Sequence, residues 1–399
     1  IEEFGNPSAL YKEGREARKA VETARADIAE TIGARAEEII FTNGGTESDN
    51  LAIFGVAYGA SRKLTSLKTG ITGNLTEAKL PAGAKNFHII TTKFEHHAVL
   101  KSCEALEKQS FDVTYINVGE DGIVNPKDVE KALRPETILV SIMYANNEIG
   151  TIQPIAEIAK VIKNYKKKKL EIRNSKLEIN GKTPFFHSDA CQASEYLDLN
   201  VEKLGVDLMT VNGSKMYGPK GIGFLYAKRG VKLSPLLYGG GQEKHLWPGT
   251  ENVPAIIGLA EAIKIAQREK GDESERVGEM RDYFIKRLLG EVPKTFLNGN
   301  IERRLPNNIN VSVLGIEGEA VVLYLDEYGI ACSTGSACTS ENFEPSHVIL
   351  ALGKPHAYAH GSIRFTLGKC NSKKDVDYTA DVLKNVVEKL RSISAVNIK

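Results

Sequence analysis

The chain has 399 residues, of which 42% are hydrophobic and 26% charged, and its formal net charge is +1. This length suits two domains, and the near-neutral charge excludes a strong electrostatic attraction to nucleic acid or to a membrane surface. No apolar run is long enough to span a bilayer, and the first residues do not form a signal peptide. Five scattered cysteines lack metal-ligand spacing, which argues against a disulfide framework or a metal site and indicates a reducing, cytoplasmic compartment.

Helical and strand-like segments alternate through the first 252 residues. Apolar positions three and four residues apart predict an amphipathic helix over residues 17–32. Short apolar runs predict seven strands, at 39–42, 88–91, 113–118, 138–144, 185–188, 208–211 and 223–226. Continuously apolar strands separated by helices are typical of an α/β fold with a mostly parallel sheet sandwiched by helices. Ligands of such sheets bind beyond the carboxyl ends of the strands.

The pattern changes near residue 253, so we predict two domains, residues 1–252 and 253–399. The second domain reads as a smaller α+β unit. Its expected elements are a helix from Ala255 to about Lys270, a second helix, strand 309–314, helix 319–328, strand 363–367 and a last helix. Residues 62–85 and 163–183 resemble insertions. We interpret the four lysines at 166–169 as part of a solvated loop rather than as a site for an acidic partner.

Polar residues follow the first two of these strands. Gly45 and Thr46 lie at a strand-to-helix turn, where free backbone N–H groups and the helix N-terminus favour a phosphate, although an ordinary capping turn is equally consistent. His96 follows the second strand and suits stacking on an aromatic cofactor or proton transfer, whereas a lone histidine there is more often structural.

Two further strands end in residues that suit a pyridine cofactor. Asp189 can pair with a protonated ring nitrogen, or it can cap a helix. Lys215 lies just beyond the next strand, where desolvation would lower its pKa and make a Schiff base feasible; a surface lysine is the alternative. These residues together indicate a pyridoxal-phosphate enzyme. They offer a phosphate-binding turn, an imidazole that can stack on the cofactor ring, a carboxylate for the ring nitrogen and a lysine that can form an imine.

Cys338 lies far downstream, in a run of small and polar residues. Such a loop can move, and its composition argues against an inert core thiol. A lysine at a strand end combined with a mobile thiol suggests Schiff-base chemistry coupled to sulfur transfer. Cys332 has no comparable role, and we interpret it as structural.

Several longer motifs make the chain resemble the cysteine desulfurases of the NifS/IscS class, within the fold-type I pyridoxal-phosphate enzymes. The resemblance covers nearly the whole chain apart from the two insertions. Its motifs are FTNGGTESDNLAI, FEHHAVL, TILVSIMYANNEIGTIQPI, HSDACQA, SKMYGPKGIG, GGGQE with GTENVP, STGSACTS with EPSHVILALG, and SIRFTLG.

The resemblance implies that the cofactor is pyridoxal 5'-phosphate and that the protein is a homodimer. It implies the following cofactor residues: Lys215 for the imine, His96 for stacking, Asp189 at the ring nitrogen, Gln192 at the ring oxygen, and Gly45, Thr46, Ser214 and a partner-derived Thr250 at the phosphate.

The resemblance also implies the reaction. Asn147 and Arg364 hold the carboxylate of L-cysteine, whose sulfur passes to the nucleophile Cys338 as a persulfide and leaves L-alanine. Lys215 and His96 move protons. A sulfur-acceptor protein such as an iron–sulfur scaffold then receives the sulfur.

Departures from the family pattern leave alternatives open. The N-terminal strand and Ala-Thr-Thr-Pro segment of the family have no counterpart here, so we expect the chain to lack that segment. Ser214 stands where the family commonly has a histidine, and Trp247 precedes Pro248 where an arginine is usual. A selenocysteine lyase, another class V aminotransferase-type enzyme and a non-catalytic binding protein are the alternative functions. A transaminase has no need of Cys338, and a lyase can work without it.

Overall fold

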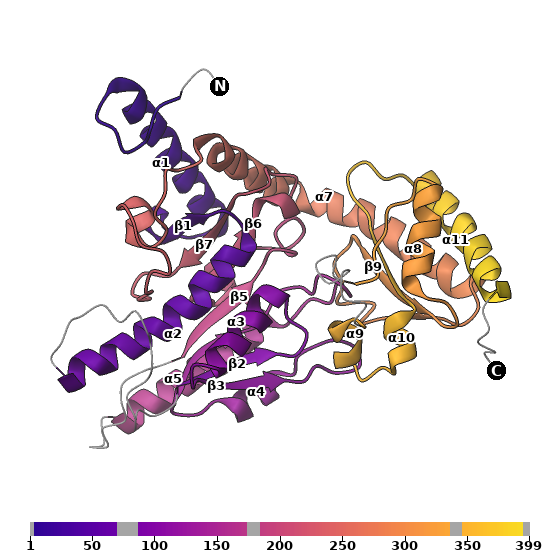
Figure 1. Ribbon diagram of the computed structural model, residues 1–399, viewed down its shortest axis with the longest axis horizontal. Helices are drawn as coiled ribbons and strands as arrows, with labels where there is room; N and C mark the ends of the chain where they lie inside the picture. Colours follow the sequence, from indigo (N-terminus) through magenta and orange to yellow (C-terminus); the bar gives the residue numbers. More distant parts are fainter. Residues whose placement is uncertain (1–3, 70–86, 174–183, 336–344, 394–399) are drawn as a thin grey trace. The chain divides into compact units, whose positions relative to one another are not determined.

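The computed structural model describes residues 4–69, 87–173, 184–335 and 345–393 (Figure 1). Contacts between residues divide the chain into two compact units. Unit 1 contains residues 1–116, 126–144 and 154–268, and unit 2 contains residues 117–125, 145–153 and 269–399. This grouping differs from the predicted division at 252/253, because residues 253–268 belong to unit 1 and two short segments from the first half of the chain belong to unit 2.

Unit 1 is built around a seven-stranded sheet in the order β1-β7-β6-β5-β4-β2-β3. The strands are β1 (Ile39–Thr42), β2 (His88–Thr92), β3 (Asp112–Ile116), β4 (Thr137–Ser141), β5 (Phe185–Asp189), β6 (Leu208–Asn212) and β7 (Gly223–Ala227). β7 runs antiparallel to both β1 and β6, and the other neighbouring pairs are parallel. The predicted mostly parallel sheet is therefore confirmed.

Helices of unit 1 follow the strands along the chain. They are α1 (Lys12–Ile32), η1 (Ala36–Glu38), α2 (Gly45–Thr69), α3 (His97–Glu107), α4 (Pro126–Ala132), α5 (Ile155–Arg173), α6 (Val201–Leu204), η2 (Gly213–Lys215) and η3 (Gln242–His245). Apolar residues of α2 and α3, including Leu51, Ile53 and Val99, pack on Ile89 and Leu139 of the sheet. Every residue of β2 and β4 is buried, which requires cover on both faces of the sheet.

Unit 2 has its own sheet and core. Strands β8 (Thr295–Leu297), β9 (Asn308–Val313) and β10 (Ser362–Thr366) form an antiparallel sheet in the order β10-β9-β8. The helices are the C-terminal part of α7 (Val253–Glu291), α8 (Gly318–Glu327), α9 (His347–Ala351), α10 (His356–His360) and α11 (Lys373–Ile393). Residues of α7, α8 and α11 pack on β9 and β10 in one apolar cluster, which gives this unit a core independent of unit 1.

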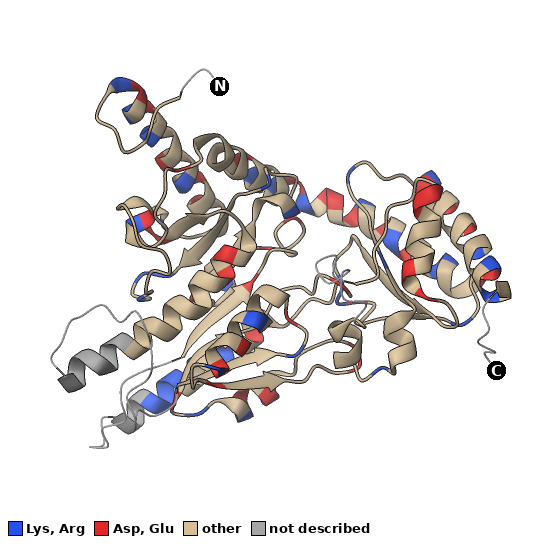
Figure 2. Cartoon of the chain, in the orientation of Figure 1, with Lys and Arg blue, Asp and Glu red and all other residues tan. Residues whose placement is uncertain are grey.

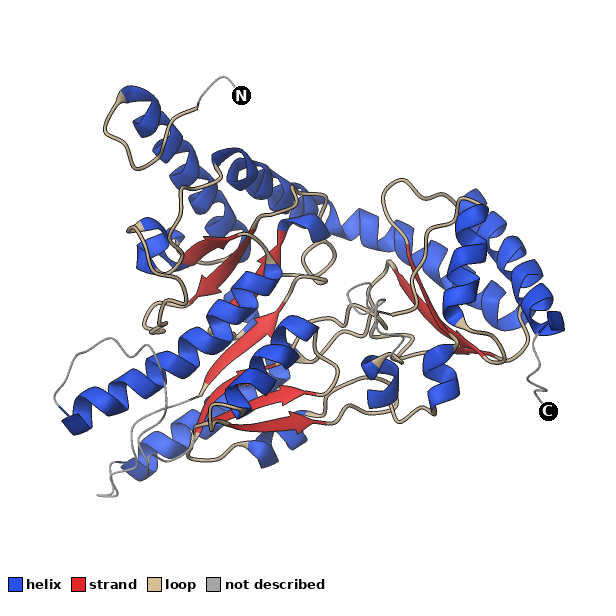
Figure 3. Cartoon of the chain, viewed as in Figure 1, coloured by secondary structure: helices blue, strands red, loops and turns tan. Residues whose placement is uncertain are grey.

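Two sequence predictions about helices were wrong. The helix expected to end near Lys270 is part of one helix, α7, which continues to Glu291 without a break (Figure 3). Gly271 does not end it, because a glycine inside a helix costs only about 1 kcal/mol relative to alanine. The lysines at 166–169 lie on α5 rather than in a loop, and Figure 2 shows basic residues gathered there. Lys166 donates to the Asp207 carboxylate at 2.8 Å.

The predicted insertions lie partly outside the described residues. Of residues 62–85, the first eight extend α2, and the rest fall outside the described ranges. Among the described helices, none combines the length and the apolar character needed to cross a membrane.

Candidate active site

The segments that follow five strands meet at one edge of the larger sheet. β1, β2, β4, β5 and β6 all run in the same direction, because β7 is antiparallel to both of its neighbours. Their carboxyl ends therefore lie at a common edge, which we call the carboxyl edge. In a doubly wound sheet this is the edge where ligands bind.

The N-terminus of α2 lies at the carboxyl edge, directly after β1. Gly45 begins the helix, and a Cβ atom added to it would lie 2.7 Å from the sulfur of Cys191, so the site tolerates only glycine. The first N–H groups of a helix have no partner within the helix and favour a negative charge. Thr46 is exposed at this point. Glu47 also caps the turn by accepting the Asn43 N–H at 2.8 Å.

His96 uses one ring nitrogen in a structural hydrogen bond, which leaves the other nitrogen available for a second role. It is the N-cap of α3, and its Nδ1 accepts a hydrogen bond from the Ala98 N–H at 3.2 Å. A ring nitrogen that accepts carries no proton, so the neutral ring has its proton on Nε2. The half-buried imidazole thus presents an N–H donor while its position is held by the helix.

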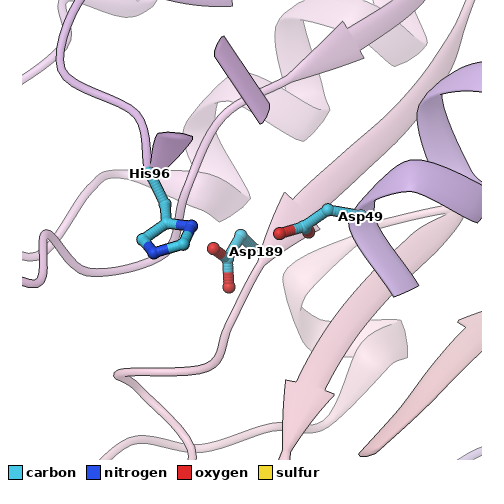
Figure 4. A group of neighbouring side chains, drawn as sticks. All are labelled: Asp49, His96 and Asp189. Atoms are coloured by element: carbon cyan, nitrogen blue, oxygen red, sulfur yellow. The ribbon is translucent and has the colours of Figure 1, made fainter. Parts of the chain in front are cut away.

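Asp189 ends β5 and faces two other polar side chains. Figure 4 shows the carboxyl group of Asp189 between the imidazole of His96 and the carboxyl group of Asp49. One oxygen of each aspartate and one ring nitrogen of His96 lie within 4.8 Å of one another. Asp189 Oδ1 accepts the N–H of Cys191 at 2.9 Å, which fixes the carboxylate at the strand end. Asp189 is 6% exposed and Asp49 is 1% exposed.

A third carboxyl group, Glu95, is buried close to the first two. Its oxygens accept the Thr92 hydroxyl at 2.7 Å and the Met143 N–H at 3.1 Å. Burial raises the pKa of Glu95 to about 8 against the effect of these hydrogen bonds, and the charge of Asp189 adds to the rise. Burial, followed by the charge of Asp189, also raises the pKa of Asp49 well above its usual range. We call Asp49, Glu95 and Asp189 the acid cluster.

Lys215 lies where the sequence predicts, but its side chain is not buried. It ends the short η2 turn directly after β6, next in the sheet to β5. The side chain is exposed, so the described residues around it do not produce the desolvation that the sequence predicts. Burial raises the pKa of the Cys191 thiol, and the positive charge of Lys215 acts in the opposite direction and lowers it. Ser214 is exposed and Gln192 partly buried on the same edge.

The residues expected to hold a substrate carboxylate come together in unit 2. Arg364 on β10 donates from Nη1 to the carbonyl oxygen of Asn147 at 2.8 Å. The backbone of Ser333 pairs with that of Arg364, which ties the start of the predicted cysteine loop to this strand. Ser346, after that loop, donates to the buried Glu148 carboxylate at 2.5 Å. Cys338 lies outside the described residues.

The remaining predicted residues have simpler surroundings. Thr250 is exposed after Gly249, whose φ of +131° favours glycine. Cys191 is buried. Cys332 packs against the core of unit 2, and burial raises its pKa to about 11, which agrees with a structural role.

Sequence reasoning missed Asp49 and Glu95. A signal for Asp49 exists in the sequence. Asp49, Ala52, Ile53 and Val56 share one face of α2 by their spacing, and the three apolar members are buried in the core. A carboxyl group on the buried face of a helix is costly and therefore indicates a special environment.

Comparison with known proteins places the chain in a family. Residues 1–172 and 173–379 match the family described as Aminotransferase class-V. The chain belongs to the class-V aminotransferase family. A cysteine desulfurase IscS of Dictyoglomus turgidum is 48% identical over 98% of this chain and 90% of its own length.

Solved structures agree with this assignment. A NifS-like protein superimposes with a TM-score of 0.82 at 32% identity and covers 98% of this chain and 93% of that one. The structure described as SspA in complex with cysteine has a TM-score of 0.72 at 33% identity, over 92% of this chain and 91% of that one. The predicted fold, a fold-type I architecture with a smaller C-terminal part, is confirmed.

Pyridoxal phosphate is the cofactor of this family, as predicted from the sequence. The carboxyl edge fits it in three respects. The start of α2 can receive a phosphate where a side chain larger than glycine would collide with Cys191. Asp189 is a buried carboxylate suited to a protonated ring nitrogen, and Lys215 follows the adjacent strand.

Proposed function

We propose that this chain is a pyridoxal-phosphate-dependent cysteine desulfurase. The observation that carries the proposal is the Asp189–His96 pair at the end of β5, with Lys215 after the neighbouring strand. A ring-nitrogen partner, a flat imidazole and an imine-forming lysine are the three protein groups that this cofactor chemistry requires. The relatives named as cysteine desulfurases support the choice of reaction.

The described residues of unit 1 then have definite roles. When bound, pyridoxal phosphate acts as an electron sink for the bonds at Cα and Cβ of an amino acid joined to it. Asp189 holds the proton on the ring nitrogen, and the α2 N-terminus with Gly45, Thr46 and Ser214 binds the phosphate. Lys215 would hold the cofactor, and its amine would move the Cα proton of the substrate. Gln192 reaches the ring oxygen.

Asn147 and Arg364 of unit 2 are proposed to bind the carboxylate of L-cysteine. The hydrogen bond from Arg364 Nη1 to the Asn147 carbonyl uses part of the guanidinium, and its remaining N–H donors suit a planar carboxylate. The structural relative described as SspA in complex with cysteine supports this substrate.

Cys338 is proposed to receive the sulfur. Its thiolate attacks the sulfur of the substrate, the substrate Cβ–S bond breaks, and its electron pair stays on the Cβ carbon, which is then protonated. L-cysteine and the Cys338 thiol thus become L-alanine and a Cys338 persulfide, with no external oxidant. His96 Nε2 is a proton carrier for this step. We propose that the persulfide passes to an acceptor protein for iron–sulfur assembly or thiolation, in the cytoplasm.

A homodimer completes the proposed phosphate site. Thr250 is exposed in the single chain, on a segment that follows the three left-handed residues Glu243, Lys244 and His245. We propose that this hydroxyl reaches the phosphate bound by a second copy of the chain.

The test is alanine and sulfide release from L-cysteine in the presence of a dithiol, which reduces the persulfide and becomes a disulfide. We expect equal amounts of both products, and their loss in Cys338→Ala. Cys370→Ala is the matched control, because Cys370 is an exposed thiol with no proposed role. Without the dithiol, wild type should release about one alanine per chain, because one thiol accepts one sulfur.

Two outcomes would contradict the proposal. Alanine release that persists in Cys338→Ala, with faster turnover of L-selenocysteine, would indicate a selenocysteine lyase. Bound cofactor with transamination of L-cysteine and no sulfide would indicate another class V aminotransferase-type enzyme.

A further inference from the structure

Asp49 is a buried carboxyl group at the carboxyl edge that the proposed reaction leaves without a role. It lies in the second turn of α2, and 1% of its surface is exposed. Its Oδ1 has no hydrogen-bond partner among the described residues. Figure 4 shows the carboxyl group directed at Asp189. An unpartnered buried oxygen of this kind costs free energy, so its retention needs an explanation.

The groups around Asp49 are polar but do not neutralise a negative charge. His187 Nε2 lies 3.6 Å from Asp49 Oδ1, and the same nitrogen lies 3.0 Å from the Thr210 hydroxyl. Burial lowers the pKa of His187 to about 4, so the ring is neutral at physiological pH. The hydroxyl of Thr210 contributes a hydrogen bond that favours ionised Asp49, but burial outweighs it.

The charges that act on the ionisation of Asp49 come from two acids, and His96 is a further titratable group within 4.8 Å of its carboxyl group. Asp189 and Glu95 both act on Asp49 to disfavour its ionisation. Asp189 accepts the Cys191 N–H, whereas Glu95 uses its oxygens on Thr92 and Met143. A second anion within 4.8 Å of Asp189 would repel it in a poorly solvated site. Asp189 Oδ1 has a backbone donor and Asp49 Oδ1 has no hydrogen-bond partner among the described residues, so this geometry favours a single negative charge, on Asp189.

We propose that Asp49 is a positioning residue that acts as a neutral carboxylic acid behind Asp189, and through Asp189 sets the contact with the cofactor ring nitrogen. Its volume prevents the Asp189 carboxylate from turning inward, and its lack of charge leaves Asp189 as the single anion that faces the ring. The inference rests on the proposed pairing of Asp189 with that nitrogen.

The test compares Asp49→Asn with Asp49→Ala in the whole 399-residue chain. Asparagine keeps the size and polarity of a neutral acid, whereas alanine removes both. The readouts are the dissociation constant for pyridoxal phosphate and the absorbance spectrum of the bound cofactor, neither of which depends on desulfurase turnover. Ser48→Ala is the matched control, because Ser48 is fully buried next to Asp49 on α2 and bonds Thr42 instead.

We expect Asp49→Asn to bind the cofactor within about twofold of wild type, with the same spectrum. Asp49→Ala should bind pyridoxal phosphate about tenfold more weakly. A well-placed hydrogen bond between Asp189 and a charged donor contributes more binding free energy than a tenfold change in affinity requires, so its partial loss accounts for this effect. The absorbance maximum of this variant should also shift. Thermal unfolding of the cofactor-free variants reports whether a loss of cofactor affinity in Asp49→Ala reflects poorer folding. In that case the affinity and spectrum of Asp49→Asn decide whether Asp49 has the proposed role.

Two results would overturn the inference. If asparagine is as harmful as alanine, an ionised Asp49 is needed. If neither substitution changes affinity or spectrum, Asp49 has no positioning role. Asp189→Asn separates these results from failure of the proposed function, because that variant must itself lose affinity and change the spectrum. If it does neither, the pairing of Asp189 with the ring nitrogen is wrong.

Discussion

The buried ion pair between Arg25 on α1 and Glu243 on η3 should control the stability of unit 1. The two guanidinium nitrogens donate to the carboxylate at 2.9 and 2.7 Å, and the residues are 6% and 8% exposed. Glu243 Oε2 also accepts the Phe41 N–H at 2.8 Å, and Arg25 Nη1 donates to the Ile39 carbonyl at 3.0 Å. The guanidinium lies 4.6 Å from the centre of the Phe41 ring.

Arg25→Met removes the cation and leaves the Glu243 carboxylate buried with only a backbone N–H. Removal of one partner from such a pair costs about 3–5 kcal/mol of unfolding free energy, because the remaining charge is uncompensated. Burial alone would lower the pKa of Arg25, yet its pKa is raised by the hydrogen bond and charge of Glu243, so the pair is strongly coupled. Glu243→Gln should cost less, because the amide oxygen can still accept.

Urea unfolding followed by fluorescence is the assay, since Trp247 is the single tryptophan of the chain and lies four residues after Glu243. The double variant should lose at least about 1.5 kcal/mol less than the sum of the single variants. Lys101→Met is the control, because its pair with Glu104 is exposed and worth less than about 1 kcal/mol. A loss below about 1 kcal/mol in Arg25→Met, or additive single effects, would refute the reasoning.

Three further predictions follow from local structure. His245→Gly should raise the unfolding free energy by about 1 kcal/mol in thermal or urea unfolding, because an exposed histidine at φ 63° is strained and glycine is not; destabilisation would contradict this. His88 is buried between the Thr137 and Thr114 hydroxyls, and burial lowers its pKa to about 4. The unfolded chain then binds more protons than the folded chain between pH 6.5 and 4, so the free energy of unfolding falls as the pH drops. His88→Gln should reduce the difference in this free energy between pH 7 and pH 5 by about 2 kcal/mol. An unchanged difference would argue against a neutral His88. Arg364→Lys should raise KM for L-cysteine at least about tenfold in the alanine assay, because lysine cannot bind a carboxylate in a bidentate manner, whereas an unchanged KM would exclude Arg364 from the substrate site.

The sheet of unit 1 could be predicted from the sequence because its strands are buried on both faces. Each predicted strand overlaps an observed one, since a run such as Ile39–Thr42 is short, apolar and bounded by turn residues. β8 was missed, because its three residues include the exposed Phe296 and carry no buried run. The length of α7 was also missed, since buried apolar residues along the helix, such as Leu259 and Leu288, outweigh a single unfavourable glycine.

The residues of the carboxyl edge were predictable for a different reason. Asp189 and Lys215 each follow a strand, and parallel strands bring such residues together whatever the loops between them do. The burial of the acid cluster could not be read in this way, because Asp49 reaches the edge from the helix that follows β1. The exposure of Lys215 likewise depends on surroundings that no local pattern encodes.

The path of the chain between the two units has a consequence for how this protein can be divided. The chain passes between them at 116/117, 125/126, 144/145, 153/154 and 268/269. Asn147 therefore belongs to unit 2 although β4 and α5 of unit 1 flank it in the sequence. No single cut yields two self-contained fragments, and the last crossing falls inside the continuous helix α7. Recombination that exchanges the C-terminal part alone would separate Arg364 from the segment that supplies its Asn147 contact, so we expect functional chimeras to need residues 145–153 and the C-terminal part from the same parent.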